Sequence, residues 1–115
     1  MYIKPGISDT SGNRIEENGQ IPIDMVTIDE DIKEKITFIK MDIEGSEKDA
    51  LLGCKNHITN DKPKLAICTY HNNEDIWKIP KMMKEFNPNY KLYMRYNGSV
   101  NGFTTSEFVT FAIDN

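Results

Sequence analysis

Two largely apolar runs of strand length, separated by one amphipathic segment, constrain the fold of this chain most. They are Thr37–Ile43 (TFIKMDI) and Leu65–Tyr70 (LAICTY), and both are rich in β-branched and aromatic residues. Between them Ala50, Cys54 and Ile58 recur at helical spacing. Strand, helix and strand of this length form a βαβ unit. We therefore predict two adjacent parallel strands joined by a right-handed crossover helix, the first of them buried on both faces.

Local signals place the ends of this crossover helix. Gly45 interrupts the first apolar run, and Ser46 with Asp49 three residues later is typical of a helix start. Asn60–Pro63 then ends the pattern. We predict one continuous helix between these points, with the negative charge of Glu47 favourable in its first turn.

The rest of the chain predicts a second helix and a hairpin. A helix should follow Asn72 and Asn73, and Pro80 should kink it or divide it into two pieces. Residues 90–96 and 108–113 read as two antiparallel strands, with Asn-Gly pairs in the NGSVNG loop between them. The predicted class is an α/β sheet of two parallel strands with a crossover helix, followed by an antiparallel C-terminal hairpin.

The chain reads as one domain over residues 1–115. Residues 1–24 are rich in Gly, Ser, Asn, Asp and Glu and read as an irregular connector, with short strands only at Tyr2–Lys4 and, just beyond it, Met25–Ile28. Residues 25–115 then form the α/β core, which fits the size of a small domain.

Composition argues against two classes of partner. The net charge is -4 and no Lys/Arg block occurs, so neither nucleic acid nor a membrane surface is expected. The apolar runs are too short to span a bilayer, and the first residues do not resemble a secretory signal. Cys54 and Cys68 lie among apolar residues without a C-x-x-C spacing. We read them as buried free thiols in a reducing, cytoplasmic protein.

Polar side chains follow both predicted parallel strands where each ends. Asp42 and Glu44 come at the end of the first strand, and Tyr70 and His71 at the end of the second. Ligands bind beyond the carboxyl ends of parallel strands in open α/β sheets. Two carboxylates facing an imidazole there would make an acid–base or polar binding cluster.

Structural explanations compete with this one for most of these residues. Glu44 and Glu47 could serve only as favourable charges at a helix N-terminus, and His71 could bond the following loop. Arg95, on the strand of residues 90–96, is either a surface or ion-pair residue or a substrate-binding group. A D-x-E pair could hold a divalent metal, but no third ligand follows at a recognisable spacing, so no metal is expected.

Several segments resemble one enzyme family. VTIDEDIKEKITFIKMDIEGSEKDALLG resembles the region of FkbM-family methyltransferases around the motif I-K-[MI]-D-[IV]-E-G-x-E. KPKLAICTYHNNEDIWKIP resembles the strand and helix that follow in a subgroup of that family, and LYMRYNG and EFVTFAI resemble its last hairpin. The resemblance covers roughly Ile23 to Ile113.

The resemblance implies a class I, Rossmann-like methyltransferase fold that uses S-adenosylmethionine and acts on a hydroxyl oxygen of a small molecule or glycan. Carried over by position, Asp42 and Glu44 are the family's D-x-E, Asp42 lies beside the methyl donor, and His71 closes the same cleft as a third catalytic residue. Tyr70 and Arg95 are then the candidate substrate-binding residues.

The chain also departs from the family pattern. The glycine-rich loop and the acidic residue that holds the cofactor ribose have no counterpart in these 115 residues, and Tyr96 stands where many members have histidine. We therefore expect the C-terminal part of a methyltransferase, inactive alone. The alternative is a non-catalytic binding or dimerisation module, with an exposed sheet edge that pairs with a second copy.

Overall fold

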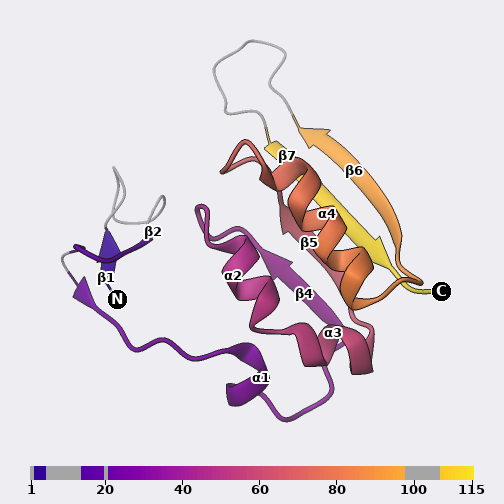
Figure 1. Cartoon of the computed structure of the whole chain (residues 1–115), viewed down its shortest axis with the longest axis horizontal. Coiled ribbons are helices and arrows are strands. Elements are labelled where there is room, and N and C mark those ends of the chain that lie inside the picture. Colours follow the sequence, from indigo (N-terminus) through magenta and orange to yellow (C-terminus); the bar gives the residue numbers. More distant parts are fainter. Residues whose placement is uncertain (1, 5–13, 20, 98–106) are drawn as a thin grey trace.

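The structure is a computed structural model that describes residues 2–4, 14–19, 21–97 and 107–115. The N-terminal segment forms a small antiparallel sheet of three short strands, β1 (Tyr2–Lys4), β2 (Arg14–Glu16) and β3 (Ile21–Pro22), in the order β2-β1-β3. Figure 1 shows that this sheet stands apart from the main body. The short strand expected at Tyr2–Lys4 is present. The one expected at Met25–Ile28 is not, because Ile28 begins a helix.

The main body is a four-stranded mixed sheet. Its strands are β4 (Phe38–Met41), β5 (Lys64–Cys68), β6 (Lys91–Asn97) and β7 (Glu107–Ile113), in the order β4-β5-β7-β6. β4 and β5 pair in parallel, and β7 pairs antiparallel with both β5 and β6. The α/β class, the parallel pair and the C-terminal hairpin are thus confirmed. The NGSVNG turn lies outside the described residues.

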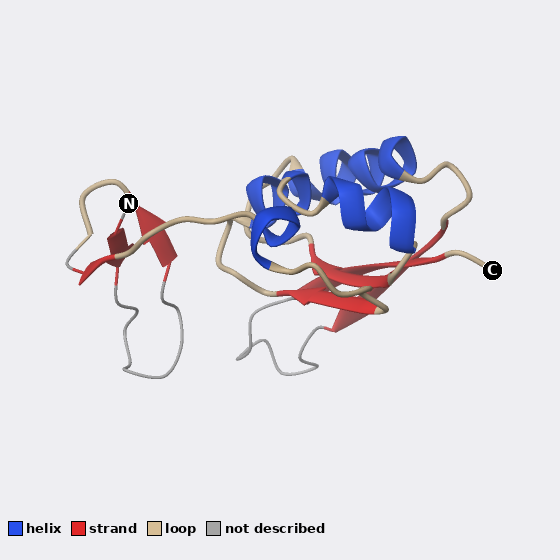
Figure 2. Cartoon of the chain, turned by 90° about the horizontal axis from the view of Figure 1, so that it is seen from below, coloured by secondary structure: helices blue, strands red, loops and turns tan. Residues whose placement is uncertain are grey.

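All four described helices cover the same face of this sheet, as Figure 2 shows. They are α1 (Ile28–Asp31), α2 (Glu47–Leu52), α3 (Lys55–Asp61) and α4 (Asp75–Phe86). The core between helices and sheet is apolar and contains Ile39, Met41, Leu51, Cys54, Ile58, Leu65, Ile67, Ile79, Met83, Tyr90 and Ala112. None of the helices in the described part of the chain combines the length and apolar character needed to cross a bilayer.

The prediction that the first parallel strand, β4, is buried on both faces is wrong. Its residues alternate, with Ile39 and Met41 buried while Phe38 is 57% exposed and Lys40 is also exposed. β4 lies at the end of the sheet and the helices cover only one of its faces, so its other face meets solvent. β5 is flanked by β4 and β7, and its residues from Leu65 to Cys68 are all buried.

The predicted single crossover helix is also wrong, because it is divided into α2 and α3 at Gly53 and Cys54. Asp29 of α1 makes hydrogen bonds to residues on both sides of this break. The Asp29 N–H donates to the Gly53 carbonyl at 2.9 Å, and the Asp29 carboxylate accepts from the N–H groups of Asn56 at 2.9 Å and His57 at 3.1 Å. A carboxylate that satisfies the free N–H groups of a helix start stabilises a new helix there.

α4 runs without division from Asp75 to Phe86, with Pro80 inside it, so of the two predicted outcomes, a kink or a division, the division does not occur. Ile79 and Met83 are fully buried on either side of the proline. Their packing against the sheet holds both turns together, which outweighs the local preference of proline for a break.

Candidate functional site

The turn between β4 and α2 is shaped by the side chain of Glu47. Its carboxylate is fully buried and accepts hydrogen bonds from the N–H groups of Ile43 at 2.9 Å and Gly45 at 3.0 Å. The backbone between them turns through positive φ at Glu44 (55°) and Gly45 (104°). Ser46, expected to cap α2, makes no side-chain capping bond. Glu47 instead reaches back and satisfies N–H groups of the turn that precedes α2.

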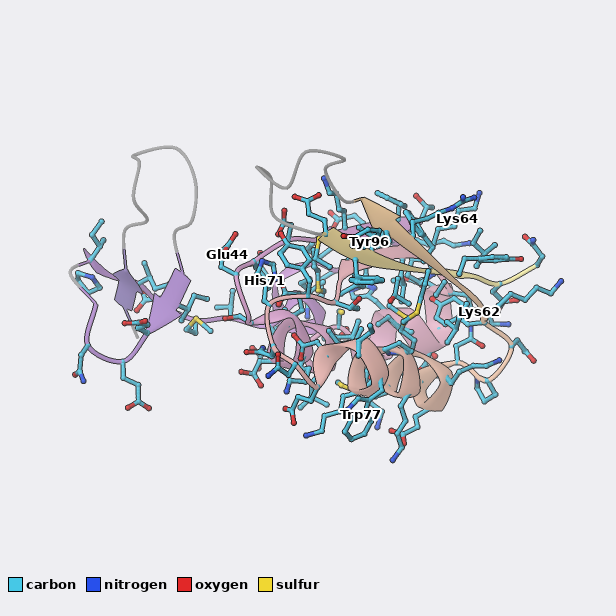
Figure 3. The ribbon with its side chains drawn as sticks, turned by 90° about the horizontal axis from the view of Figure 1, so that it is seen from above. Glu44, Lys62, Lys64, His71, Trp77 and Tyr96 are labelled. Carbon is cyan, nitrogen blue, oxygen red and sulfur yellow. The ribbon has the colours of Figure 1, made fainter. Side chains whose placement is uncertain are left out.

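The parallel pairing brings the ends of β4 and β5 together. Met41 lies opposite Ile67, so the residues that follow each of them emerge at the same edge of the sheet. Nε2 of His71 lies 3.5 Å from Oδ1 of Asp42 and 3.5 Å from Oε2 of Glu44. Figure 3 shows Glu44 and His71 side by side at this end, opposite Lys62 and Lys64. The structure therefore brings together the three residues predicted to share one cleft.

His71 also contacts Glu47. Its Nδ1 lies 2.9 Å from Oε1 of Glu47, yet neither ring nitrogen has a hydrogen-bond partner with suitable alignment. Glu47 therefore belongs to the same group of side chains, although the sequence predicted for it only a favourable charge at the helix start. The sequence signal for it is the third carboxylate of D-x-E-x-x-E, three residues after Glu44.

Tyr70 contacts two members of the cluster formed by Asp42, Glu44 and His71. Its hydroxyl donates to Oδ1 of Asp42 at 3.3 Å, and its ring lies against the imidazole of His71 with centroids 4.1 Å apart. Burial, with a smaller effect from the Asp42 charge, raises the pKa of Tyr70, so the hydroxyl stays protonated and able to donate. The Asp42 and Glu44 side chains are 42% and 38% exposed, so the cluster is open to solvent.

An open polar groove begins at His71. It has a volume of about 690 Å³ and is lined by Gly45, Lys48, Asp49, His71, Asn72, Asn73 and Glu74. Lys48 pairs with Glu74 and lies 3.5 Å from Asp75. The hydrogen bond from Lys48, joined by one from Lys78, lowers the pKa of Glu74 to about 2. The groove thus presents fixed charges and amide groups next to the cluster.

Two other polar residues lie outside this arrangement. Arg95 is exposed on β6, separated from β5 by β7, and no contact among the described residues joins it to the cluster. His57 is engaged elsewhere, with Nδ1 2.6 Å from Asp61 and Nε2 2.8 Å from the Ile32 carbonyl. Nε2 thus ties α3 to the end of α1, and Nδ1 makes a contact within α3, so the role of His57 is structural.

Comparisons with known proteins give a consistent result. The family model described as the methyltransferase FkbM domain matches residues 3–100. The crystal structure of methyltransferase FkbM from Methylobacillus flagellatus KT is similar, with a TM-score of 0.64 and 37% sequence identity. That match covers 73% of this chain and 22% of the solved chain, so the chain corresponds to less than a quarter of its length. No curated protein matches.

Proposed function

The chain belongs to the FkbM methyltransferase family, and from this premise we propose that it is the C-terminal part of an S-adenosylmethionine-dependent O-methyltransferase. The acceptor is a hydroxyl group of a small molecule or sugar. The chain alone is inactive, because the residues that would bind most of the methyl donor belong to other parts of such an enzyme. The observation that carries the proposal is the equal approach of His71 Nε2 to Asp42 and Glu44 at the edge of the sheet.

The cluster fits one feature of S-adenosylmethionine, its positive charge. When bound, the donor supplies an electrophilic methyl group on a cationic sulfur. The exposed carboxylate of Asp42 would hold that charge at the carboxyl end of the sheet, where ligands of α/β folds bind. Among the described residues, His71 is the only basic side chain within ion-pair distance of Asp42 and Glu44.

The chain's own residues then act on the acceptor. The exposed carboxylate of Glu44 accepts the hydrogen bond of the reacting hydroxyl and takes its proton as the oxygen becomes a nucleophile, while Nε2 of His71, 3.5 Å away, orients that carboxylate. Tyr70 holds Asp42 through the hydrogen bond to Oδ1. Alignment of the hydroxyl provides most of the acceleration, since proton transfer alone contributes less.

The polar groove supports a sugar or other polyhydroxylated acceptor. Lys48, Asn72, Asn73 and Glu74 line it beside His71. Amide and charged side chains can donate to and accept from several hydroxyl groups at once, which suits a carbohydrate better than an apolar substrate. Free Cys54 and Cys68 support a reducing, cytoplasmic setting for the reaction.

Methyl transfer by a longer protein that contains this chain tests the proposal. Asp42→Asn, Glu44→Gln and His71→Gln should each lower turnover by about 10²- to 10⁴-fold, the usual contribution of a general acid or base. Glu85→Gln, on the exposed side of α4, is the matched control and should leave turnover unchanged. Unchanged transfer in all three site variants would show that the cluster is structural.

Calorimetric titration of the 115-residue chain tests the claim that most of the residues that bind the methyl donor belong to other parts of the enzyme. Binding of S-adenosylmethionine with a Kd below about 100 μM, equivalent to about -5.5 kcal/mol, would contradict it. Weaker binding is the expected result.

The alternative function is a non-catalytic dimerisation module. It is supported by β4, which pairs only with β5 among the described strands and carries Phe38 at 57% exposure. Such an edge can pair with a second copy. Sedimentation equilibrium separates the two functions, because a stable dimer lost on Phe38→Lys, together with no methyl transfer by the longer protein, would favour the module.

A further inference from the structure

A mostly apolar pocket lies next to the polar groove. It has a volume of about 370 Å³, which is within the usual range of small-molecule sites. Its apolar walls come from the segment that leads into α1 and from the β4–α2 region, with Met25, Val26, Ile28, Ile43 and Ala50. Met25 is 51% and Val26 66% exposed, so the pocket leaves apolar surface in water that a ligand would cover.

The wall formed by residues 24–28 is held against α2 by backbone contacts. The Asp29 N–H donates to the Gly53 carbonyl at 2.9 Å, and a Cβ added at Gly53 would meet the Cβ of Thr27 at only 3.2 Å. Glycine therefore allows the segment before α1 to lie directly on the end of α2. Thr27 also forms a capping box with Glu30, which fixes the start of α1. The pocket is thus built into the fold.

The pocket adjoins the cluster of Asp42, Glu44 and His71. Ile43 lines the pocket and stands between Asp42 and Glu44 in the chain, so its Cα lies about 3.8 Å from each of theirs. Asp49 lines both the pocket and the polar groove that begins at His71. A ligand with one apolar and one polar part can therefore contact the pocket and the groove together.

Charge and size restrict what the pocket can hold. The charged residues that line it are Asp24, Glu30 and Asp49, all acidic, and no described lysine or arginine lines it. A carboxylate or phosphate on the ligand would meet like charge there, so a neutral apolar group fits best. One turn of an α-helix with its side chains fills more than about 400 Å³, so the pocket is too small for a helix of a partner protein.

We propose that this pocket binds the apolar aglycone of a neutral glycoside whose sugar lies in the adjoining polar groove. Burial of the aglycone supplies most of the affinity, and the polar groove supplies hydrogen bonds to the sugar hydroxyls. The inference rests on the proposed function only where it makes this glycoside the methyl acceptor. Binding of the glycoside is measured without the methyl donor.

NMR titration of the 115-residue chain with hexyl β-glucoside and with methyl β-glucoside tests the pocket. Hexyl β-glucoside should bind at least about 10-fold more tightly, because each buried methylene improves affinity by up to about four-fold. Hexanoate should bind at least about 10-fold more weakly than hexyl β-glucoside, since its carboxylate meets the acidic lining. The methyl signals of Ile43 and Ala50, which line the pocket, should shift, and those of the core residue Ile58 should not.

Val26→Asp tests the same pocket by substitution. Val26 is 66% exposed, so the variant should still fold, but its carboxylate lies where the hexyl group binds. It should weaken hexyl β-glucoside binding by about 10-fold or more and leave methyl β-glucoside within about two-fold. Leu52→Asp is the matched control. It also replaces an apolar side chain that is 58% exposed, but Leu52 does not line the pocket, so both affinities should stay within about two-fold.

Equal affinities of the unsubstituted chain for hexyl and methyl β-glucoside would overturn the proposal, whatever the variants do. Equal weakening by Leu52→Asp and Val26→Asp would overturn it as well. A cluster that does not support methyl transfer would leave these binding results unchanged. A longer protein that transfers methyl groups, combined with a chain that shows no preference for the hexyl group, would overturn the pocket assignment alone.

Discussion

Oε1 of Glu47 lies 2.9 Å from Nδ1 of His71. The carboxylate that accepts hydrogen bonds from the turn after β4 therefore also contacts the imidazole that follows β5. Two elements that are distant in the sequence are thereby joined through one buried side chain. The shape of the turn and the position of the candidate site depend on the same residue.

Glu47→Ala should therefore destabilise the chain strongly. It removes two hydrogen bonds from backbone N–H groups to a buried carboxylate, and it leaves those donors without a partner. Hydrogen bonds to charged groups contribute about 1.5 to 3 kcal/mol each, and the effects within one turn overlap, so we expect a loss of about 3 kcal/mol. Urea unfolding measures it.

Asp49→Ala is the control for this prediction. Asp49 lies in the same first turn of α2 but is exposed, so its loss should cost about 0.3 to 1 kcal/mol through the helix dipole alone. Equal losses of unfolding free energy in the two variants would show that Glu47 acts only through its charge at the N-terminus of α2.

Gly45→Ala tests the backbone of the same turn. Gly45 has a φ of 104°, which L-residues rarely adopt, although an added Cβ would meet its nearest neighbour, Asn72, only at 3.6 Å. The cost is thus conformational rather than steric, and we expect about 1 to 3 kcal/mol in urea unfolding.

Lys62→Gly tests the same backbone effect in the opposite direction, because it places glycine where lysine now has a positive φ. Lys62 is exposed and ends α3 with a φ of 54°, so glycine there should raise the free energy of unfolding by up to about 1 kcal/mol. A stabilised Gly45→Ala variant, or a destabilised Lys62→Gly variant, would show that backbone strain does not govern these two turns.

Much of this fold could be predicted because its strongest signals are local. The apolar runs around Ile39 and Ile67 define the parallel strands by length and residue type, and the parallel pairing follows from the helical segment between them. Parallel strands end at the same edge, so the meeting of Asp42, Glu44 and His71 followed from topology alone.

What could not be predicted depends on tertiary contacts. The division of the crossover helix requires Asp29, which reaches Asn56 and His57 from another helix. The exposure of Phe38 depends on which face of the sheet the helices cover. The residues around Phe38 do not indicate which face that is. The contact of Glu47 with His71 also spans two elements, so the local sequence showed only a charge at a helix start.

The two cysteines should resist thiol reagents in the folded chain. Burial raises the pKa of both Cys54 and Cys68 to about 12, with nearby carboxylates adding to the effect, so almost no thiolate is present at neutral pH. Labelling with a disulfide reagent should be slow in buffer and fast in urea, with two thiols titrated in urea. Rapid labelling of either thiol in buffer would contradict their burial.

The raised pKa values of the two thiols predict that the chain loses stability at alkaline pH. A thiol whose pKa is raised by folding contributes stability below the unfolded value of 9.0, and this contribution is lost as pH rises toward about 12. The urea midpoint should therefore fall from about pH 9 upward. Cys54→Ala should reduce that slope, since one of the two ionisations is then absent.

The ion pair between His57 and Asp61 should stabilise the fold most within a definite pH range. The hydrogen bond to Asp61, 2.6 Å long, raises the pKa of His57, and the backbone N–H of Ile36 followed by His57 lowers the pKa of Asp61. His57 contributes stability below its unfolded value of 6.5 and loses it as pH rises through the raised pKa. Asp61 contributes above 3.8 and loses it as pH falls through the lowered pKa. Both contributions are therefore present together between these two values.

Urea midpoints measured across pH should show this directly. The difference between the unsubstituted chain and His57→Gln should be largest between about pH 4 and 6.5 and should shrink at higher pH, because the unsubstituted chain then loses the charge on His57. Asp61→Asn should reduce the same difference, since the imidazole loses its partner. A difference that stays constant from pH 5 to pH 9 would mean that His57 stabilises the fold as a neutral ring, through its bond to the Ile32 carbonyl.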